Sequence, residues 1–432
     1  MASDREIREA WQPYQPGDGK PWNLALAAHL LRRGGFGSGW ERLQQALADG
    51  PRRTVEKLFA PPADLDAFER RMAELEAPVA ISDDGSSHPC AELWLYRMIY
   101  MPQPLWERMT LFWHDYFAVA GERVGRARLM MRHVRLLRRH ALGRFDTLLR
   151  EICRDPATLA ANGARANRKG RPAVEFASAL LRRYTVGAAA LAPEDAPEAA
   201  RAFTGAHVLR NEYQYLEHEH DGGAKLLLGR EGNFTGDDAL GILLAHPATA
   251  RTVVRRMYRW LVSETAEPDE ALLASLAGTF AKDYDIAALA RAILRSNHFF
   301  SPAAYRQRVK SPVEFALGLA AAFEAPLAPA ALHPQLSELG QRLLEPPTSE
   351  GWAGGRRWLN RFTVAGRGTL AAALVGAEGQ AGKVYPEEVA RRHGRTEPAA
   401  IARFFQELLV QSDVPAQARA HQIAMLPEFQ LA

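Results

Sequence analysis

The first segment with groups that could do chemistry is an aromatic stretch around His114, which is flanked by Trp113 and Asp115. Aromatic neighbours lower the local polarity, and this can move the pKa of an imidazole away from its solution value. Such a histidine could bind a metal ion or transfer a proton. The alternative is a core histidine whose ring hydrogen-bonds to a backbone group.

A second such segment, residues 217–221, reads Glu-His-Glu-His-Asp and is followed by Lys225. His218 and His220 would share a face only if the segment is extended, where imidazole and carboxylate together could hold a zinc-like or iron-like ion. The HExxH motif of zinc hydrolases is absent. A solvated, charged loop is the alternative interpretation.

Together the two segments suggest an active site. In this hypothesis His114, His220 and Asp221 bind a divalent metal ion or handle protons, and Lys225 stabilises an anion. The hypothesis requires that the two segments, about a hundred positions apart, converge in one cleft.

Aromatic residues suggest a ligand-binding surface as well. Trp352 and Trp358 accompany the glycines of residues 351–355 and could line a pocket with aromatic faces, as sugar and peptide sites do, with Trp113 as a further candidate contact. A tightly packed turn is the alternative for residues 351–355.

Basic residues are unevenly distributed. Eight arginines and no acid occur between Arg123 and Phe145. A helix carrying Arg132 and Arg135 could contact phosphates or an acidic lipid surface, or its arginines could pair with acids elsewhere in the fold. No nucleic-acid motif accompanies it and aromatic residues are not interleaved, which argues against DNA or RNA as the partner.

Composition sets the protein class. A chain of 432 residues with 47% hydrophobic and 24% charged residues is typical of a globular protein. No apolar run approaches the roughly 20 residues needed to cross a bilayer. The N-terminus has no signal or transit pattern, so we expect a cytoplasmic location. Cys90 and Cys153 are too few and too isolated for a disulfide framework or a thiolate zinc site.

Apolar residues recur at three- and four-residue spacing along most of the chain, which predicts helices. The stripe that includes Met257, Trp260 and Leu261 is expected to lie in the core. Alternating strand patterns are almost absent, although residues 213–216 and 226–228 could pair as a minor hairpin. The main predicted helices cover residues 24–31, 40–47, 54–59, 65–75, 90–100, 106–117, 126–142, 247–261, 270–280, 286–296, 312–323, 336–343 and 401–410.

These patterns predict an all-α protein, a large single-domain multi-helix bundle with at most a minor β-hairpin. Residues 1–21 are polar and contain three prolines, so we expect them to form an arm on the surface. Residues 22–432 form the predicted helical domain.

Several sequence blocks, in this order, resemble the bacterial family called domain of unknown function 1800. The resemblance spans roughly residues 22–370 and implies one helical domain with no assigned activity. It also implies a partner, because family members are often encoded beside a sulfatase-like or alkaline-phosphatase-like protein. The blocks are residues 29–37, 107–117, 141–145, 167–170, 220–225 with 228–229, 246–251, 310–315, and 346–347 with 351–355 and Trp358.

The chain departs from the family pattern where the family carries polar side chains. A second histidine of the aromatic block is replaced by Tyr116, a Tyr-Leu-Asp stretch by residues 161–163, and several polar positions by smaller or different residues. The last group comprises Ala173, Val174, Ser178, Ala179 and Arg182. If those side chains form a family active site, the site is damaged here.

We therefore expect an uncharacterised helical protein with a degenerate or atypical active-site scaffold that binds a partner or an anionic ligand. The alternative is a metal-dependent or acid/base hydrolase that uses His114, His220 and Asp221. Whether the chain is an enzyme stays open at this stage.

Overall fold

The computed structural model describes residues 3–62, 64–82, 85–265, 267–375, 384–411 and 420–432. Helices supply nearly all of its regular structure, and two small antiparallel sheets of two strands each supply the rest. The predicted all-α architecture is therefore confirmed. None of the helices in these residues is long and apolar enough to cross a membrane.

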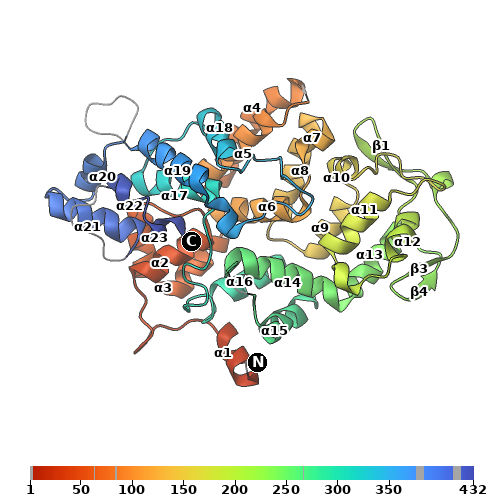
Figure 1. Cartoon of the computed structure of the whole chain (residues 1–432), viewed down its shortest axis with the longest axis horizontal. Helices are drawn as coiled ribbons and strands as arrows, with labels where there is room; N and C mark the ends of the chain where they lie inside the picture. Colours follow the sequence, from red (N-terminus) through yellow and green to blue (C-terminus); the bar gives the residue numbers. More distant parts are fainter. Residues whose placement is uncertain (1–2, 63, 83–84, 266, 376–383, 412–419) are drawn as a thin grey trace.

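The helices of the first half are interrupted by short turns (Figure 1). They are α1 (Asp4–Trp11), α2 (Leu24–Arg33), α3 (Trp40–Phe59), α4 (Leu65–Ser82), α5 (His88–Tyr100), α6 (Pro104–Phe117), α7 (Gly121–Val124), α8 (Ala127–Arg139), α9 (Phe145–Ile152), α10 (Pro156–Ala161), α11 (Val174–Ala179), the π-helix η1 (Leu180–Tyr184), the 3-10 helix η2 (Ala188–Ala190) and α12 (Asp195–Ala202).

The second half begins with the two hairpins and continues in helices. Its elements are β1 (Ala206–Leu209), β2 (Glu212–Tyr215), η3 (Glu217–Glu219), β3 (Lys225–Leu227), β4 (Arg230–Gly232), α13 (Gly236–Ala245), α14 (Pro247–Leu261), α15 (Glu270–Phe280), α16 (Ile286–Leu294), α17 (Pro312–Phe323), α18 (Pro329–Glu338), η4 (Gly355–Trp358), α19 (Arg361–Leu374), α20 (Pro386–Arg392), α21 (Pro398–Leu409), α22 (Ala420–Ile423) and α23 (Pro427–Gln430).

Local sequence signals set several helix ends. Ser311 caps α17: its hydroxyl accepts from the backbone N–H of Glu314, and the Glu314 carboxylate accepts from the backbone N–H of Ser311. Pro312 occupies the first helical position, where its missing N–H costs nothing. In α3 the direction changes at Gly50, whose φ of 77° is reached freely only by glycine.

The hairpins differ from the pairing expected from sequence. Residues 213–216 do not pair with residues 226–228; β2 pairs with β1, and β3 pairs with β4. The reason lies in the turns, because each hairpin closes through two residues with positive φ, Arg210 and Asn211 in one and Leu228 and Gly229 in the other. Such turns match the twist of two adjacent strands.

The segment expected as a surface arm includes helix α1, which has no buried residue and lies on α15, where the indole N–H of Trp11 donates to the backbone oxygen of Leu272 at 3.2 Å. Other helices differ from the expected ones. The helix predicted at residues 336–343 is α18 and lies earlier in the chain. Helix α11 and the π-helix η1 had not been predicted.

Helix α6 lies near the middle of the molecule (Figure 1) and is buried on almost every face, against α3, α5, α8 and α14. A sequence with apolar residues on all sides is stable as a helix only when it is surrounded by other elements. The central position of α6 places the aromatic segment around His114 inside the core. The boundary predicted between residues 21 and 22 stays a prediction.

Candidate functional site

His114 is a core residue of α6. Its side chain is fully buried, and its ring lies 5.3 Å from that of Trp94, 5.5 Å from Trp352 and 6.4 Å from His133, measured between centroids. Neither ring nitrogen has a hydrogen-bond partner among the described residues. Burial lowers the pKa of His114 to about 3, so the ring is neutral at physiological pH.

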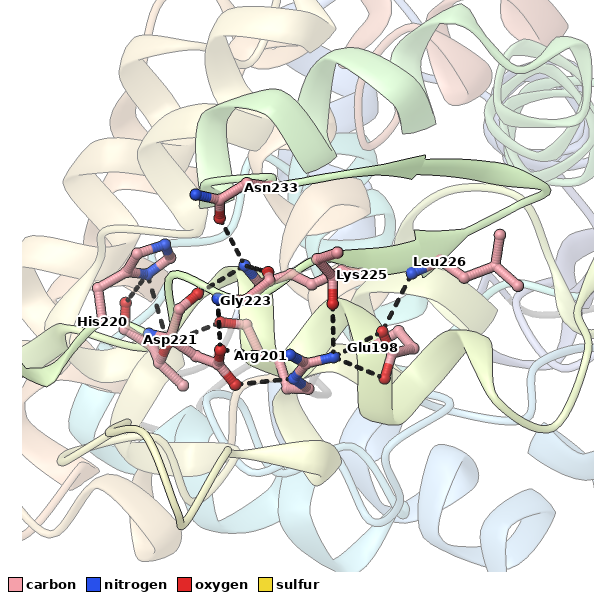
Figure 2. Close-up of polar contacts among 10 residues, drawn as sticks. Glu198, Arg201, His220, Asp221, Gly223, Lys225, Leu226 and Asn233 are labelled. Carbon is pink, nitrogen blue, oxygen red and sulfur yellow. Dashed lines mark hydrogen bonds and ion pairs between the residues drawn. The ribbon is translucent and has the colours of Figure 1, made fainter.

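The predicted cluster at residues 220–225 is a tightly bonded turn beside β3 (Figure 2). Lys225 is 1% exposed, and its ammonium donates to the backbone oxygens of Asp221 at 2.6 Å and Gly223 at 2.9 Å and to Oδ1 of Asn233 at 3.2 Å. An ammonium has three protons to donate. All three are engaged by the protein, so the expected role of Lys225 in stabilising a bound anion is not supported.

Asp221 is held by Arg201, which donates from Nε to Oδ2 at 2.7 Å and from Nη2 to Oδ1 at 3.2 Å. The same arginine also contacts Glu198 of its own helix, α12, so it ties the turn to that helix (Figure 2). The hydrogen bond from Arg201 lowers the pKa of Asp221 to about 2. Asp221 therefore stays ionised and does not exchange a proton near neutral pH.

His220 is also engaged within the turn. Its Nδ1 lies 2.9 Å from the backbone oxygen of Thr204, to which it donates in the matching tautomer. The backbone N–H of the next residue, Asp221, donates to the Thr204 hydroxyl at 2.7 Å. The cluster thus fixes the loop between η3 and β3 against the end of α12.

The two predicted halves of the site do not meet. His114 lies in α6 near the middle of the molecule, whereas residues 220–225 lie with α12 and the hairpins at one end (Figure 1). The described part of the chain contains no group of three or more His, Cys, Asp or Glu residues that could hold a metal ion. The shared cleft of His114, His220 and Asp221 is therefore not formed.

The arginine-rich helix pairs with acids from other elements. Arg132 donates to both carboxylate oxygens of Glu212 at 2.6 and 2.8 Å, and Arg135 donates from Nε to Glu76 at 2.9 Å. Arg138 likewise donates to Glu107 at 2.6 Å. Of the two interpretations of these arginines, internal pairing accounts for Arg132 and Arg135.

Trp113 packs in the core rather than at a surface. It is fully buried, and its indole N–H donates to the backbone oxygen of Ala141 at 3.1 Å. The rings of Phe117 and Phe145 stack on it with centroids 5.9 and 5.7 Å away. A tryptophan enclosed in this way has no face left for a ligand.

Trp352 and Trp358, in contrast, line a cavity of about 330 Å³. This volume falls in the range of roughly 300–1,000 Å³ typical of ligand pockets. Both tryptophans pack on Val309 in a small cluster apart from the main core. We call this space the tryptophan cavity. Its other lining residues are Leu111, Phe112, Asp115, Tyr116, Arg255, Arg256, Arg259, Trp260, Glu264, Arg308, Ser311, Gln341, Glu350, Ala353 and Gly354.

Asp115, which directly follows His114, is an acid of this cavity. Its Oδ1 accepts the backbone N–H of Trp352 at 2.8 Å, and no described residue donates to its Oδ2. Burial raises the pKa of Asp115 to about 6, although the charges of Arg256 and Arg308 oppose the shift. Its protonation state therefore changes within the physiological range.

Gly351 lets the loop approach this carboxylate. Its φ is 81°, and a Cβ atom at this position would overlap Oδ1 of Asp115. We expect Gly351→Ala to lower the free energy of unfolding by about 1–3 kcal/mol through backbone strain and to lose further stability through the overlap. Gly170→Ala is the matched control, because Gly170 has a φ of 84° but open space around the missing Cβ. Equal losses in chemical denaturation would show that the overlap with Asp115 has no consequence.

Buried charges form a cluster that reaches the tryptophan cavity, which Arg308 and Glu264 of this cluster line; we call the cluster the floor. Arg308 is 3% exposed and lies 3.1 Å from Glu314 and 3.5 Å from Glu264, and Arg108 also pairs with Glu314. The charge of Arg33 also interacts with the charges of these groups. Its guanidinium forms hydrogen bonds with the backbone oxygens of residues 261 and 262. Three guanidinium groups thus face two carboxylates, and one positive charge lacks a compensating acid within this group.

Trp260 lines the cavity next to the charged floor. The guanidinium carbons of Arg108 and Arg308 each lie 4.8 Å from the centroid of its ring. The expectation that Trp260 is a plain core residue is therefore incomplete, because the ring also lines the cavity and contacts two cations.

Arginines of α14 form the rim. Arg256 is partly buried, donates to the backbone oxygen of Tyr116 at 3.0 Å and lies 3.3 Å from Glu350, while the exposed Arg259 lies 3.0 Å from Glu267. An exposed ion pair such as that of Arg259 contributes little to stability, so this arginine can change partners at low cost.

Tyr116, at which the resemblance led us to expect a histidine, is a hydrogen-bonded core residue. The Tyr116 hydroxyl donates to the backbone oxygen of Tyr184 at 2.9 Å, and the Tyr184 hydroxyl donates to that of Phe117 at the same distance. Burial raises the pKa of Tyr116, so its hydroxyl stays protonated. That these replacements damage a family active site stays a prediction.

Sequence reasoning missed Asp115 and Arg308 as cavity residues. The available signal for Asp115 was a single acid in the otherwise uncharged residues 109–117, since a carboxyl group in an apolar helix needs a partner or a polar cavity. For Arg308 there was no comparable signal.

Comparison with known proteins identifies the family of this chain. A sequence model described as a protein of unknown function (DUF1800) matches residues 29–431, nearly the whole chain. Searches of curated proteins and of solved structures gave no match. The chain therefore belongs to the DUF1800 family, whose activity is not known.

Proposed function

We propose that this protein binds a small organic anion with a planar ring in the tryptophan cavity. The observation that carries the proposal is the excess of buried positive charge in the floor, where Arg33, Arg108 and Arg308 face Glu264 and Glu314, while Asp115, a further acid near Arg308, is held toward its neutral form by burial. Removing a charged group from water costs several kcal/mol unless an opposite charge compensates it. An anion in the cavity would supply the missing negative charge.

The walls favour a ligand with a ring. Trp352 and Trp358 line the cavity, and Trp260 lies beside them. Aromatic side chains offer flat apolar area together with edges that attract polar groups, so they suit planar or sugar-like ligands. The volume of about 330 Å³ limits the ligand to a small molecule.

Gln341 adds a neutral donor at the floor. Its Oε1 accepts the backbone N–H of Val313 at 3.0 Å, which leaves its amide NH₂ as the end that can donate to a ligand. Together with the guanidinium group of Arg308, this donor favours an oxyanion over a cation.

This proposal keeps the anionic ligand expected from the sequence but moves its site away from Arg132 and Arg135. Catalysis through His114, His220 and Asp221 lacks support, because burial keeps His114 neutral and Arg201 keeps Asp221 ionised. General acid–base chemistry needs a group whose pKa lies near the working pH. A sulfatase-like or phosphatase-like partner and a cytoplasmic location stay predictions.

Arg308→Met tests the proposed site. At pH 5 we expect phenyl sulfate and benzoate to raise the melting temperature of the wild type in a saturable manner, and benzyl alcohol to have no such effect. Arg308→Met should lose this response. Because it also leaves the buried Glu264 without its ion pair, the variant should be less stable, so the response is measured as the shift from each protein's own melting temperature without ligand.

Arg144→Met is the matched control, since Arg144 is exposed and pairs with Asp146 outside the cavity. It should respond to both anions as the wild type does. Equal responses in wild type and Arg308→Met, or no response in the wild type, would overturn the proposal.

A further inference from the structure

The carboxyl group of Asp115 is placed to meet the anionic group of a ligand. Asp115 lines the tryptophan cavity, and its Oδ1 is engaged by the backbone N–H of Trp352 at 2.8 Å. Since no described residue donates to Oδ2, this oxygen is the one left for the cavity. An anion bound beside Arg308 therefore has this acid as a neighbour.

Several segments bring charged groups to the cavity around Asp115. Helix α14 contributes Arg256, with Arg255 and Arg259 on the same cavity. The segment after α14 contributes Glu264, the segment before α17 contributes Arg308, and the loop that ends in Trp352 contributes Glu350. Arg256 and Arg308 each have a carboxylate of their own nearby, Glu350 for Arg256 and Glu264 for Arg308. Neither cation forms an ion pair with Asp115 among the described contacts, so the carboxylate form of Asp115 is poorly stabilised.

The floor has a deficit of one negative charge, and two groups could supply it. One is ionised Asp115 and the other is the ligand. Both cannot do so together, because two anionic oxygens at hydrogen-bond distance in a partly buried site repel each other strongly. Binding of an anion should therefore convert Asp115 to its neutral form.

Building on the proposed function, we propose that the ligand is an oxyanion that accepts a hydrogen bond from neutral Asp115, and that its binding takes up one proton from solvent. On binding, the Asp115 carboxylate takes up one proton from solvent. The resulting carboxylic acid donates a hydrogen bond from Oδ2 to an oxygen of the anionic ligand. No bond of the ligand forms or breaks. The pKa of about 6 for Asp115 in the free protein agrees with a proton that is absent at pH 7.5 and present at pH 5.

Proton uptake can be measured by titration calorimetry with phenyl sulfate, which stays ionised over the whole pH range. In buffers of different ionisation enthalpy at pH 7.5, we expect the wild type to take up close to one proton per bound ligand, and close to none at pH 5. Between pH 6 and pH 8 the affinity should fall roughly tenfold per pH unit. Benzoate should behave in the same way.

Asp115→Asn mimics the neutral acid, because its amide oxygen can still accept from Trp352 and its NH₂ can donate to the ligand. At pH 8 it should bind phenyl sulfate roughly 100-fold more tightly than the wild type, with no proton uptake and little pH dependence. Glu175→Gln is the control: this carboxylate is 57% exposed and pairs with Arg123 outside the cavity, so its removal should leave proton uptake in place.

The outcomes separate the two proposals. Binding of phenyl sulfate by the wild type without proton uptake at pH 7.5, or an unchanged pH dependence in Asp115→Asn, overturns the role of Asp115 but leaves the anion site intact. Absence of binding by wild type and Asp115→Asn at both pH 5 and pH 7.5 overturns the anion site and this inference with it.

Discussion

Glu314→Gln is expected to destabilise the protein by about 3–5 kcal/mol, among the largest effects of any single substitution proposed for this chain. Glu314 is 3% exposed and pairs with both Arg108 and Arg308, and its backbone and carboxylate also form the cap of α17 with Ser311. Without its charge, three buried guanidinium groups would face Glu264 alone. Urea denaturation at pH 7 measures the loss directly.

Comparing Glu314→Gln with Arg308→Met shows whether the excess of positive charge or the ion pair itself controls stability. Arg308→Met removes the other member of the same ion pair but also reduces the excess of positive charge, so its loss of stability should be smaller than that of Glu314→Gln. Equal losses in both variants would mean that the pair itself, and not the excess of positive charge, controls stability. The proposed anion site would then lose its main support.

Stability should also depend on pH through Glu314. Burial alone would raise the pKa of Glu314, but the charges of Arg108 and Arg308 outweigh burial and hold the pKa below its ordinary value of 4.5. A carboxyl group with a depressed pKa in the folded state contributes stability above its unfolded pKa, and this contribution is lost as the pH falls. The wild type should therefore lose stability below about pH 4.5, and Glu314→Gln should lose less over the same range.

Lys225→Met is also expected to have a large effect, lowering the free energy of unfolding by about 3 kcal/mol. The change leaves the backbone oxygens of Asp221 and Gly223 and the side chain of Asn233 without the donor that they now share. Each unsatisfied buried polar group costs about 1–3 kcal/mol, and part of this loss can be recovered by water because the turn lies at the edge of the fold. Chemical denaturation measures the total.

Hydrogen exchange would show where the loss occurs. Protection should fall first in the amides of residues 217–235, around η3 and the β3–β4 hairpin. Lys169→Met is the control, because Lys169 is exposed and should be replaceable without loss. If Lys225→Met kept the full stability of the wild type but lost binding of phenyl sulfate, Lys225 would be a ligand-binding residue, contrary to its observed bonding.

Helices were the part of this fold that local sequence patterns could predict. The range 270–280 agrees with α15 and 312–323 with α17, because caps, prolines and apolar spacing act within a few residues of each other. The predicted pairing of the strands was wrong for a related reason. Positive-φ turns at Arg210 and Leu228 carry no strong sequence signal, since neither residue type prefers that conformation.

The site could be predicted only in part, because spacing along the chain does not encode distance in space. Trp352 and Trp358 were identified as candidate pocket residues and line the tryptophan cavity. His114 and His220, however, were joined in one site by their chemistry alone, and the fold places them in different regions. Arg132 appeared to have an available charge because its partner, Glu212, is eighty positions away.

A crystal structure with 4-iodobenzoate at pH 5 would show whether an anion binds in the tryptophan cavity. We expect an iodine anomalous peak between Trp352 and Trp358 and a carboxylate within hydrogen-bond distance of Arg308 and Oδ2 of Asp115. A saturating soak that leaves the cavity without this peak, or that places the anion on Arg132 and Arg135, would contradict the proposed anion site.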